Sequence, residues 1–320
     1  MTTSGTATFN LNTNQIVTTA LRKVGAIAAG ETPDNQTTQD CTDQLNMLVK
    51  ALNATGLHIW TETEATLFLQ PSQTSYTLGG STTDHATESF TATTLSAAAA
   101  SGATSIGVVS ATGFAATYNV GIVLDSGSIF WTTESGAPSG TTITLALALT
   151  GAAASGNAVY VYQTNIIRPL RVVSGRRFAF SGSLDTQMMA LSRIDYRNLP
   201  NKTNTGVVTQ YFYDPRGGAN TQGIFYVWPA PADVSSCVKF TWWRPVQDFV
   251  AAGNTPDLPN EWIDALVWNL AYKMAPEYDC PPQRYAMLKD NAATSLDLVM
   301  GWDREPESYL FGFNADQTGP

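Results

Sequence analysis

Nucleophilic catalysis by a Ser–His or Cys–His pair needs a histidine beside the nucleophile and an acid that orients it. The sequence has two histidines, His58 and His85, and three cysteines, Cys41, Cys237 and Cys280. His58 follows an expected helix end and His85 lies in a loop rich in Thr and Asp, so both are interpreted as surface or packing residues. The cysteines are too far apart for a disulfide framework or a paired metal site, and Cys41 falls on an apolar helical stripe.

Two groups of carboxylates are spaced closely enough to suggest acid–base chemistry. Glu62 and Glu64 lie two residues apart, which places both on one face of an extended strand. Asp303, Glu305 and Glu307 form a second group near the C-terminus. A carboxylate pair could cleave a glycan, but sequence spacing does not set the geometry between the two groups. Solvated surface acids are therefore the preferred interpretation, and glycan cleavage stays open as the alternative.

Several motifs with a known mechanism are missing from the sequence. It contains no Gly-x-Ser-x-Gly elbow, no phosphate-binding Gly-x-x-x-x-Gly-Lys, no His-Glu-x-x-His and no dinucleotide glycine fingerprint. We therefore predict that the protein is not an enzyme, with no catalytic residue, no metal ligand and no cofactor.

Basic side chains are concentrated in one stretch. Residues 51–167 contain no Lys or Arg, whereas seven basic residues lie within 168–202, offset there only by Asp185 and Asp195. One interpretation is a solvated or internally paired sheet surface. The other is a contact with nucleic-acid phosphate or with an acidic patch on a partner, since arginine suits both. The residues are Arg168, Arg171, Arg176, Arg177, Arg193, Arg197 and Lys202.

Composition excludes other classes of function. A length of 320 residues corresponds to about two domains, and 43% hydrophobic residues can build a sizeable core. The net charge of −9 argues against a chain that coats nucleic acid or an anionic membrane. No apolar run is long enough to cross a bilayer, and the N-terminus does not resemble a secretion signal. These features predict a soluble, acidic protein made in a cytoplasm.

Apolar periodicity predicts helices at both ends of the chain. A first helix is expected over 12–31 and a second over 37–55, where Leu45, Leu48 and Leu52 continue one stripe. A third is expected to open at Pro259, with Ile263, Leu266 and Leu270 on its apolar side, and a fourth over 282–300. The last residues have no helical or strand period but carry four large aromatic side chains, Trp302, Tyr309, Phe311 and Phe313.

Between the helices the period changes to that of strands. Strand formers bounded by Pro and Gly occupy 59–84 and 166–250, and an Ala/Ser/Thr/Gly-rich stretch over 85–165 predicts short strands with glycine turns. The expected fold class is α+β, with a helical bundle made by the N-terminal hairpin and the C-terminal helices, a β-sheet or barrel middle region, and an inserted all-β module. The expected domains are 1–58, 59–84 with 166–250, 85–165, 251–300 and an extended tail over 301–320.

The order of these elements resembles the head-to-tail adaptors, or connectors, of short-tailed bacteriophages, which include the tail accessory factor and tail tubular protein A types. The segment most similar to that family runs from Leu258-Pro259-x-Glu261-Trp262 to Ala275-Pro276-Glu277-Tyr278. The Leu-x-x-Leu-x-x-x-Leu helix that ends near Gly56-Leu57 is the second similar segment, and the strands of 166–245 are similar more loosely. The stretch 85–165 departs from the smaller members of the family.

The resemblance implies a structural role in the virion, at the portal vertex. Such adaptors form a ring, usually of twelve copies, that joins the portal to a downstream tail or nozzle protein and continues the channel through which genomic DNA passes without tight binding. No membrane is involved. The alternative is a tail-associated glycan-binding or glycan-cleaving protein that works through 85–165. Carried over, the portal-docking tail holds Trp302, Tyr309, Phe311 and Phe313, and the subunit-contact helices hold Leu45, Leu48, Leu52, Ile263, Leu266 and Leu270.

Overall fold

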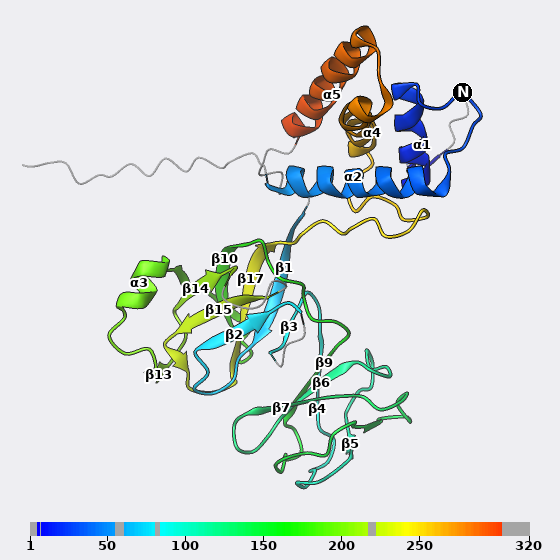
Figure 1. Ribbon diagram of the computed structural model, residues 1–320. Helices are drawn as coiled ribbons and strands as arrows, with labels where there is room; N and C mark the ends of the chain where they lie inside the picture. The colour runs from blue at the N-terminus through cyan, green and yellow to red at the C-terminus, as the bar shows by residue number, and fades with distance from the viewer. Residues whose placement is uncertain (1–4, 7, 55–60, 81–83, 217–221, 303–320) are drawn as a thin grey trace, which may run out of the picture. The chain divides into compact units, whose positions relative to one another are not determined.

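The protein divides into two compact units in the computed structural model (Figure 1). The helical unit combines Met1–Trp60 with Val246–Pro320, and the β unit is Thr61–Pro245. The structure describes residues 5–6, 8–54, 61–80, 84–216 and 222–302.

Helices from both ends of the sequence share one core in the helical unit. The helices are α1 (Thr13–Val24), α2 (Asn35–Ala54), α4 (Trp262–Met274), the short 3-10 helix η2 (Ala275–Tyr278) and α5 (Pro282–Trp302). Helix α4 packs against α1, α2 and α5. Its Leu266 and Leu270 side chains are fully buried among apolar residues that include Ile16 of α1 and Leu45 of α2. The hydrophobic contacts of α4 therefore hold the other three helices together.

Local signals determine the bounds of α1. The Asn12 side chain accepts a hydrogen bond from the backbone N–H of Gln15, and the Gln15 side chain accepts one from the N–H of Asn12, which is a capping box. The helix ends at Gly25, whose φ of 90° is in the left-handed region that favours glycine. The helix expected over 12–31 therefore ends earlier than its apolar pattern indicated.

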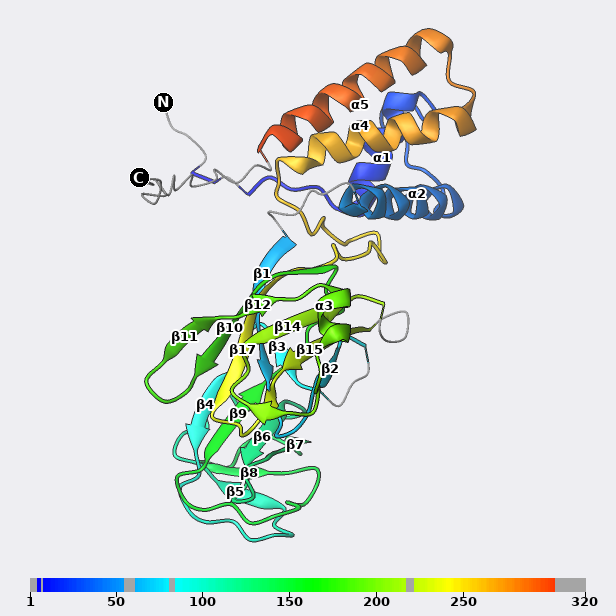
Figure 2. The same ribbon diagram turned by 90° about the vertical axis from the view of Figure 1, so that its left-hand side faces the viewer.

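The predicted fold class, an α+β protein built on a helical bundle, is wrong. Strand makes up 30% of the residues and helix 27%, and the strands form several separate sheets. The helices also point in different directions, because α1 runs up the view of Figure 1 while α2 runs across it, and Figure 2 shows α4 and α5 inclined to both. A bundle needs nearly parallel helices that mesh along their length. The described strands close no barrel either, since β3 and β11 remain at the edges of the largest sheet.

Two facing sheets form the body of the β unit. A five-stranded sheet has the order β11-β10-β17-β1-β3, and a four-stranded sheet has the order β12-β14-β15-β2. Leu67, Phe240 and Trp242 of the first sheet are buried against Tyr76 and Phe225 of the second. The strands are β1 (Glu62–Phe68), β2 (Ser75–Leu78), β3 (Ala86–Thr87), β10 (Arg171–Ala179), β11 (Leu184–Gln187), β12 (Met189–Ala190), β14 (Gln210–Asp214), β15 (Gly223–Trp228) and β17 (Ser236–Trp243).

Two smaller elements complete this body. The short helix α3 (Arg193–Asn198) contacts β14, and a parallel pair joins β13 (Thr205–Gly206) to β16 (Ala230–Pro231). Helix α3 was not expected from the sequence, because six residues are too few to show a helical period.

The Ala/Ser/Thr/Gly-rich stretch forms short strands, as its composition predicted. One sheet has the order β4-β9-β6-β7, and β5 pairs with β8. Val120, Ile143 and Val159 are buried in a core that belongs to these strands. The strands are β4 (Thr91–Thr94), β5 (Ser105–Gly107), β6 (Asn119–Val123), β7 (Ile129–Thr133), β8 (Thr142–Thr144) and β9 (Ala158–Tyr162).

A partly buried histidine lies where these inserted strands meet β1. The His85 ring stacks on Trp131 with ring centroids 3.9 Å apart, and His85 Nδ1 lies 2.5 Å from Tyr162 Oη. Tyr162 donates its hydroxyl proton to Asn165 Oδ1 at 2.7 Å, so its oxygen accepts the Nδ1–H of His85. Phe68 at the end of β1 packs on Tyr162 and Trp131. Burial lowers the pKa of His85 to about 4, so the imidazole is neutral at pH 7.

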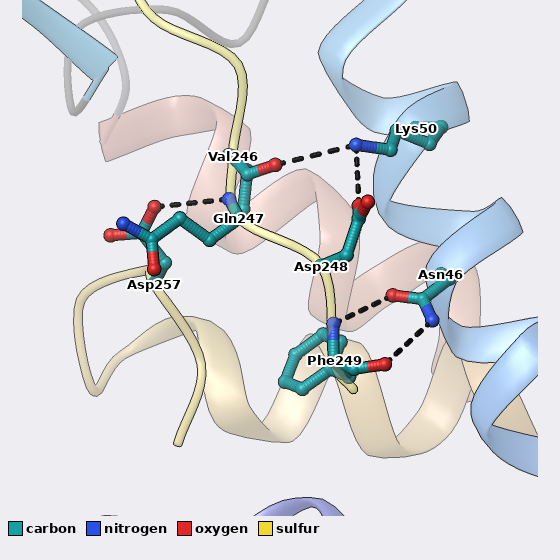
Figure 3. A network of polar contacts seen from close by, with 7 residues as sticks. All are labelled: Asn46, Lys50, Val246, Gln247, Asp248, Phe249 and Asp257. Atoms are coloured by element: carbon teal, nitrogen blue, oxygen red, sulfur yellow. Dashed lines mark hydrogen bonds and ion pairs between the residues drawn. The ribbon is translucent and has the colours of Figure 1, made fainter. Parts of the chain in front are cut away.

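A polar network attaches the segment after β17 to α2 (Figure 3). The Asn46 side chain accepts from the backbone N–H of Phe249 and donates to its carbonyl, both at 2.9 Å. The Phe249 ring is buried in the helical core. Lys50 pairs with Asp248 at 2.5 Å one turn further along, but both of these side chains are half exposed.

Replacing Asn46 with Ala should lower the free energy of unfolding of the helical unit by about 1–3 kcal/mol, because the two buried backbone groups of Phe249 lose their partner. Urea unfolding followed by circular dichroism at 222 nm measures it. Lys50→Ala is the control and should cost less than about 1 kcal/mol, since exposed ion pairs contribute little. Equal losses for the two variants would contradict the assigned role of Asn46.

Acid should destabilise the β unit through His85. A pKa lowered in the folded state means that stability is complete above the unfolded value of about 6.5 and is lost as the pH falls from there towards 4. The expected loss is about 3 kcal/mol, because each pKa unit corresponds to ~1.4 kcal/mol. Urea unfolding of the wild type and of His85→Gln between pH 7 and pH 4 measures it. The carboxylates common to both proteins contribute equally to the change in the free energy of unfolding with pH. The wild type should therefore lose more stability than His85→Gln on acidification, and equal losses would contradict the prediction.

Candidate functional site

Among the described residues, two of the three thiols that could act as nucleophiles are buried. Cys41 and Cys237 are buried, and burial raises the pKa of their thiols to about 11 and about 12, which makes them unreactive. Cys280 is partly buried, and His58 lies outside the described residues. The part of the chain that the structure describes contains no group of three or more His, Cys, Asp or Glu side chains that could hold a metal ion.

A polar cavity of about 230 Å³ lies beside His85. Its polar walls are Gln70, Gln73 and Asp84, and these groups are already engaged. Gln73 donates to Asp84 at 2.6 Å, and the Gln70 side chain forms two hydrogen bonds with the backbone of Ile129. The cavity therefore belongs to the joint between the inserted strands and β1.

The two carboxylates of β1 are occupied by neighbours on the outer face of the five-stranded sheet. Glu62 accepts a hydrogen bond from the indole N–H of Trp243 at 3.2 Å. Glu64 forms an ion pair with Arg176 of β10. The predicted placement of both carboxylates on one strand face is correct, but each is bound to a different partner. The pair is not poised around a substrate position.

The arginines of β10 are separated by the alternation of the strand. Arg171 and Arg176 lie on the outer face, where Arg171 stands 5.0 Å above the Trp243 ring and Arg176 meets Glu64. Arg177 lies on the opposite face and donates to Thr186 Oγ1 at 3.4 Å. All three make contacts within the chain, as in the internally paired interpretation of the basic stretch.

The other arginines converge at the end of β14, around Asp214. Arg193 of α3 donates to Asp214 Oδ1 at 2.7 Å, and the backbone N–H of Arg216 donates to the same atom at 3.0 Å. Arg168 donates to the carbonyl of Pro215, the next residue, at 3.1 Å. Four arginines therefore contribute to this end of β14: two through their charge on the buried carboxylate, one through its backbone N–H and one through the neighbouring carbonyl. They are Arg168, Arg193, Arg197 and Arg216, which are distant in sequence.

The electrostatics of Asp214 follow from this arrangement. Burial raises the pKa of Asp214, but the hydrogen bonds from Arg193 and the Arg216 backbone outweigh it, and the charge of Arg197 adds to them. The net result is a pKa below the usual value, so Asp214 stays ionised and orients Arg193. Arg197 is exposed, and its side chain forms no hydrogen bond or ion pair with the described residues.

Apolar and aromatic side chains accompany these arginines. Tyr196 of α3 stacks near Phe212 and Tyr226, with ring centroids 5.8 and 4.8 Å away, and Arg193 lies 5.5 Å above the Phe212 ring. Ile194 is 69% exposed. Met189 of β12 is 59% exposed, and its register beside Gln210 places it on the same sheet face as Phe212. We name this region the arginine–aromatic surface. It consists of Met189, Arg193, Ile194, Arg197 and Phe212.

Sequence reasoning missed several parts of this surface. Arg216, Asp214 and Phe212 were not singled out. The available signal was the alternation in Gln210–Asp214, which places Phe212 and Tyr211 on opposite faces. The contribution of Arg168 and Arg193 to the same place depends on sheet pairing and could not be inferred from spacing.

Charge is divided unevenly between the two units. The helical unit contains seven Lys and Arg residues against sixteen Asp and Glu residues, and the β unit contains ten of each. The whole net charge of −9 is therefore carried by the helical unit. Within the β unit, all ten basic residues follow residue 167.

The residues expected in contacts between copies are mostly internal to one chain. Leu45, Ile263, Leu266 and Leu270 are buried in the helical core, and Leu48 and Leu52 are partly buried against it. Contacts between copies through these helices would have to use their exposed faces. Of the expected portal-docking tail, Trp302 is the last residue of α5. Tyr309, Phe311 and Phe313 lie outside the described residues.

Comparison with known protein families gives a match. Residues 141–309, just over half of the chain, match the family of the SU10 adaptor protein. No curated protein is significantly similar to the chain, and no helix of the described residues could span a membrane. The match supports the phage adaptor part of the resemblance, but not the narrower short-tailed connector or tail tubular type. The region matched includes the arginine–aromatic surface, β17, α4 and α5, and the chain belongs to the SU10 adaptor protein family, a family of phage structural adaptors.

Proposed function

We propose that the protein joins the capsid to the tail of a bacteriophage as a ring of identical copies beneath the portal. The ring, of twelve copies by the resemblance to connectors, continues the DNA channel towards a downstream tail or nozzle protein. The family match over residues 141–309 carries this proposal. The role is structural and located in the virion, the protein is made in the host bacterial cytoplasm, and it uses no cofactor.

The charge distribution supports a passage for DNA rather than a DNA-binding site. A channel that lets DNA slide must not hold the phosphate backbone tightly, and negative charge repels it. The helical unit has an excess of nine acidic residues, and Arg171 and Arg176 of the β unit are already engaged. Genomic DNA therefore passes as cargo with weak contacts.

No specific observation favours the alternative of a glycan-cleaving protein. Its best candidates, Glu62 and Glu64, are bound to Trp243 and Arg176. The inserted strands over 85–165 are proposed instead as a module that decorates the adaptor, with its own core of residues such as Val120 and Ile143.

The purified protein should form rings, either alone or when mixed with the matching portal protein. Mass photometry and negative-stain microscopy measure this directly. A heterologous contact repeated around an axis closes into a ring when the rotation between copies closes. A protein that stays monomeric with and without portal would contradict the proposal.

Removal of residues 303–320 should leave the helical unit folded and abolish attachment to the portal. The deleted segment follows the last residue of α5 and carries three of the four candidate docking aromatics, Tyr309, Phe311 and Phe313. Aromatic side chains typically anchor such contacts. Co-sedimentation with portal measures attachment. The control is a full-length variant in which Asp303, Glu305 and Glu307 are changed to the corresponding amides, so that the aromatic side chains remain, and it should attach normally. Unchanged attachment by the truncated protein would remove the docking role.

A further inference from the structure

The arginine–aromatic surface has the composition of a protein interface. Arg, Met and aromatic residues are enriched at interface cores, and Lys is depleted. Here Arg193 and Arg197 lie one helical turn apart on α3, which also carries the exposed Ile194. The exposed Met189 shares the sheet face of Phe212, the ring over which Arg193 lies. A surface that contacted only phosphate would gain nothing from the two apolar side chains. The neighbours therefore favour a protein partner over DNA.

The same chain carries a surface of opposite charge in its helical unit. Asp40 and Asp43 are exposed on α2, and Met47, 50% exposed, continues their stripe one turn later. Glu277 of η2 joins them, because the Gln44 side chain, next to Asp43, donates to Glu277 Oε1 at 3.2 Å. We name Asp40, Asp43, Met47 and Glu277 the acidic surface.

The charges of the acidic surface are free to pair with another molecule. Asp40 and Asp43 accept hydrogen bonds from the neutral side chains of Gln36 and Gln39. Across the described ranges, none of Asp40, Asp43 and Glu277 forms an ion pair. Lys273 of α4 donates to the backbone carbonyl of Gln44 at 3.4 Å.

We propose that the arginine–aromatic surface of one copy docks on the acidic surface of the next copy. The occupant is a second copy of this chain, because the complementary charge and an exposed methionine are present on a different unit of the same protein. Two different surfaces meet in such a contact, so it is heterologous and repeats from copy to copy around a ring. The inference rests on the proposed assembly and names the residues that would hold it.

The arrangement gives Asp214 a role beneath the arginines. An isolated Arg193 would move freely and lose side-chain entropy on binding. The ionised Asp214 holds the guanidinium in place at 2.7 Å before a partner arrives. Arg197 has no such partner in the described structure, and it is the charge that an acidic neighbour would satisfy.

A charge exchange tests this contact. Arg197→Glu and Asp43→Arg should each weaken association between copies at least tenfold, because each places like charges together. In the proposed contact, Arg197 of one copy pairs with Asp43 of the next. The double variant Arg197→Glu/Asp43→Arg should therefore recover to within about threefold of the wild type, because this ion pair re-forms with its charges exchanged. Both positions are exposed, and circular dichroism verifies that each variant is folded. Lys289→Glu, an exposed residue of α5 outside both surfaces, is the control and should assemble normally.

The outcomes separate the surface from the assembly. Association is measured by mass photometry at 50 and 300 mM salt, alone and on the portal. If the wild type forms rings and the two single variants and the double variant form them equally well, the docking surface is overturned and the proposed ring is left intact. A wild type that never assembles would overturn both. Loss of binding to a random-sequence DNA duplex by Arg197→Glu, with no rescue of assembly by the double variant, would assign the arginines to DNA instead.

Discussion

Pairing of β17 with β1 is the constraint on which the arrangement of the chain depends. Glu62 at the start of β1 faces Trp243 at the end of β17, and the N–H of Arg244 donates to the carbonyl of Thr61 at 3.0 Å. The chain therefore enters and leaves the β unit at the same place. Because of this, helices that lie on either side of the whole β unit in the sequence can contribute to one core. Leu45 of α2 and Leu270 of α4 meet there.

The two faces of β17 have different roles in the β unit. Phe240 and Trp242 of β17 are buried against the four-stranded sheet, while Lys239 and Trp243 face outward. On the outward face, Lys239 lies 3.9 Å above the Phe178 ring, and Trp243 lies beneath Arg171. One strand thus fixes both the core and the pairing of the outer charges. That pairing removes Arg171, Arg176 and Glu64 from the set of residues that a partner could use.

Periodic burial could be predicted from the sequence, and the directions of the helices could not. The stripe that includes Leu45 and Leu48 predicted a helix over 37–55, and α2 spans Asn35–Ala54. It begins earlier than expected because the Asp34 side chain accepts a hydrogen bond from the free backbone N–H of Thr37 in the first turn. An apolar stripe does not indicate the direction in which a neighbouring helix runs, and the prediction of a helical bundle was wrong for that reason. The possible barrel was also wrong, because barrel closure depends on whether edge strands pair, which strand patterns do not indicate.

The basic stretch shows the same limit at the level of a site. Arg176 and Arg177 are adjacent in sequence and lie on opposite faces of β10. Arg168 and Arg193 are far apart in sequence, yet they bind the adjacent residues Pro215 and Asp214. The local density of arginines predicted a sheet surface that is paired internally or contacts a partner. It did not predict which arginines share one surface. Strand alternation and sheet order make that selection, and both are tertiary properties.

The division of charge between the units suits the proposed assembly, which must be firm and must also let DNA move. An exposed ion pair contributes at most about 1 kcal/mol, so one copy held by a few such pairs would bind weakly. In a closed ring every copy is held on two sides, and small energies combine because the loss of one copy breaks two contacts at once. Buried apolar area can then come from residues such as Ile194 and Met47, while the arginines set orientation. When the arginines of the arginine–aromatic surface pair with carboxylates of the next copy, most of the charge that remains exposed is the negative charge of the helical unit. Attraction between copies and weak contact with DNA then follow from the same separation of charge.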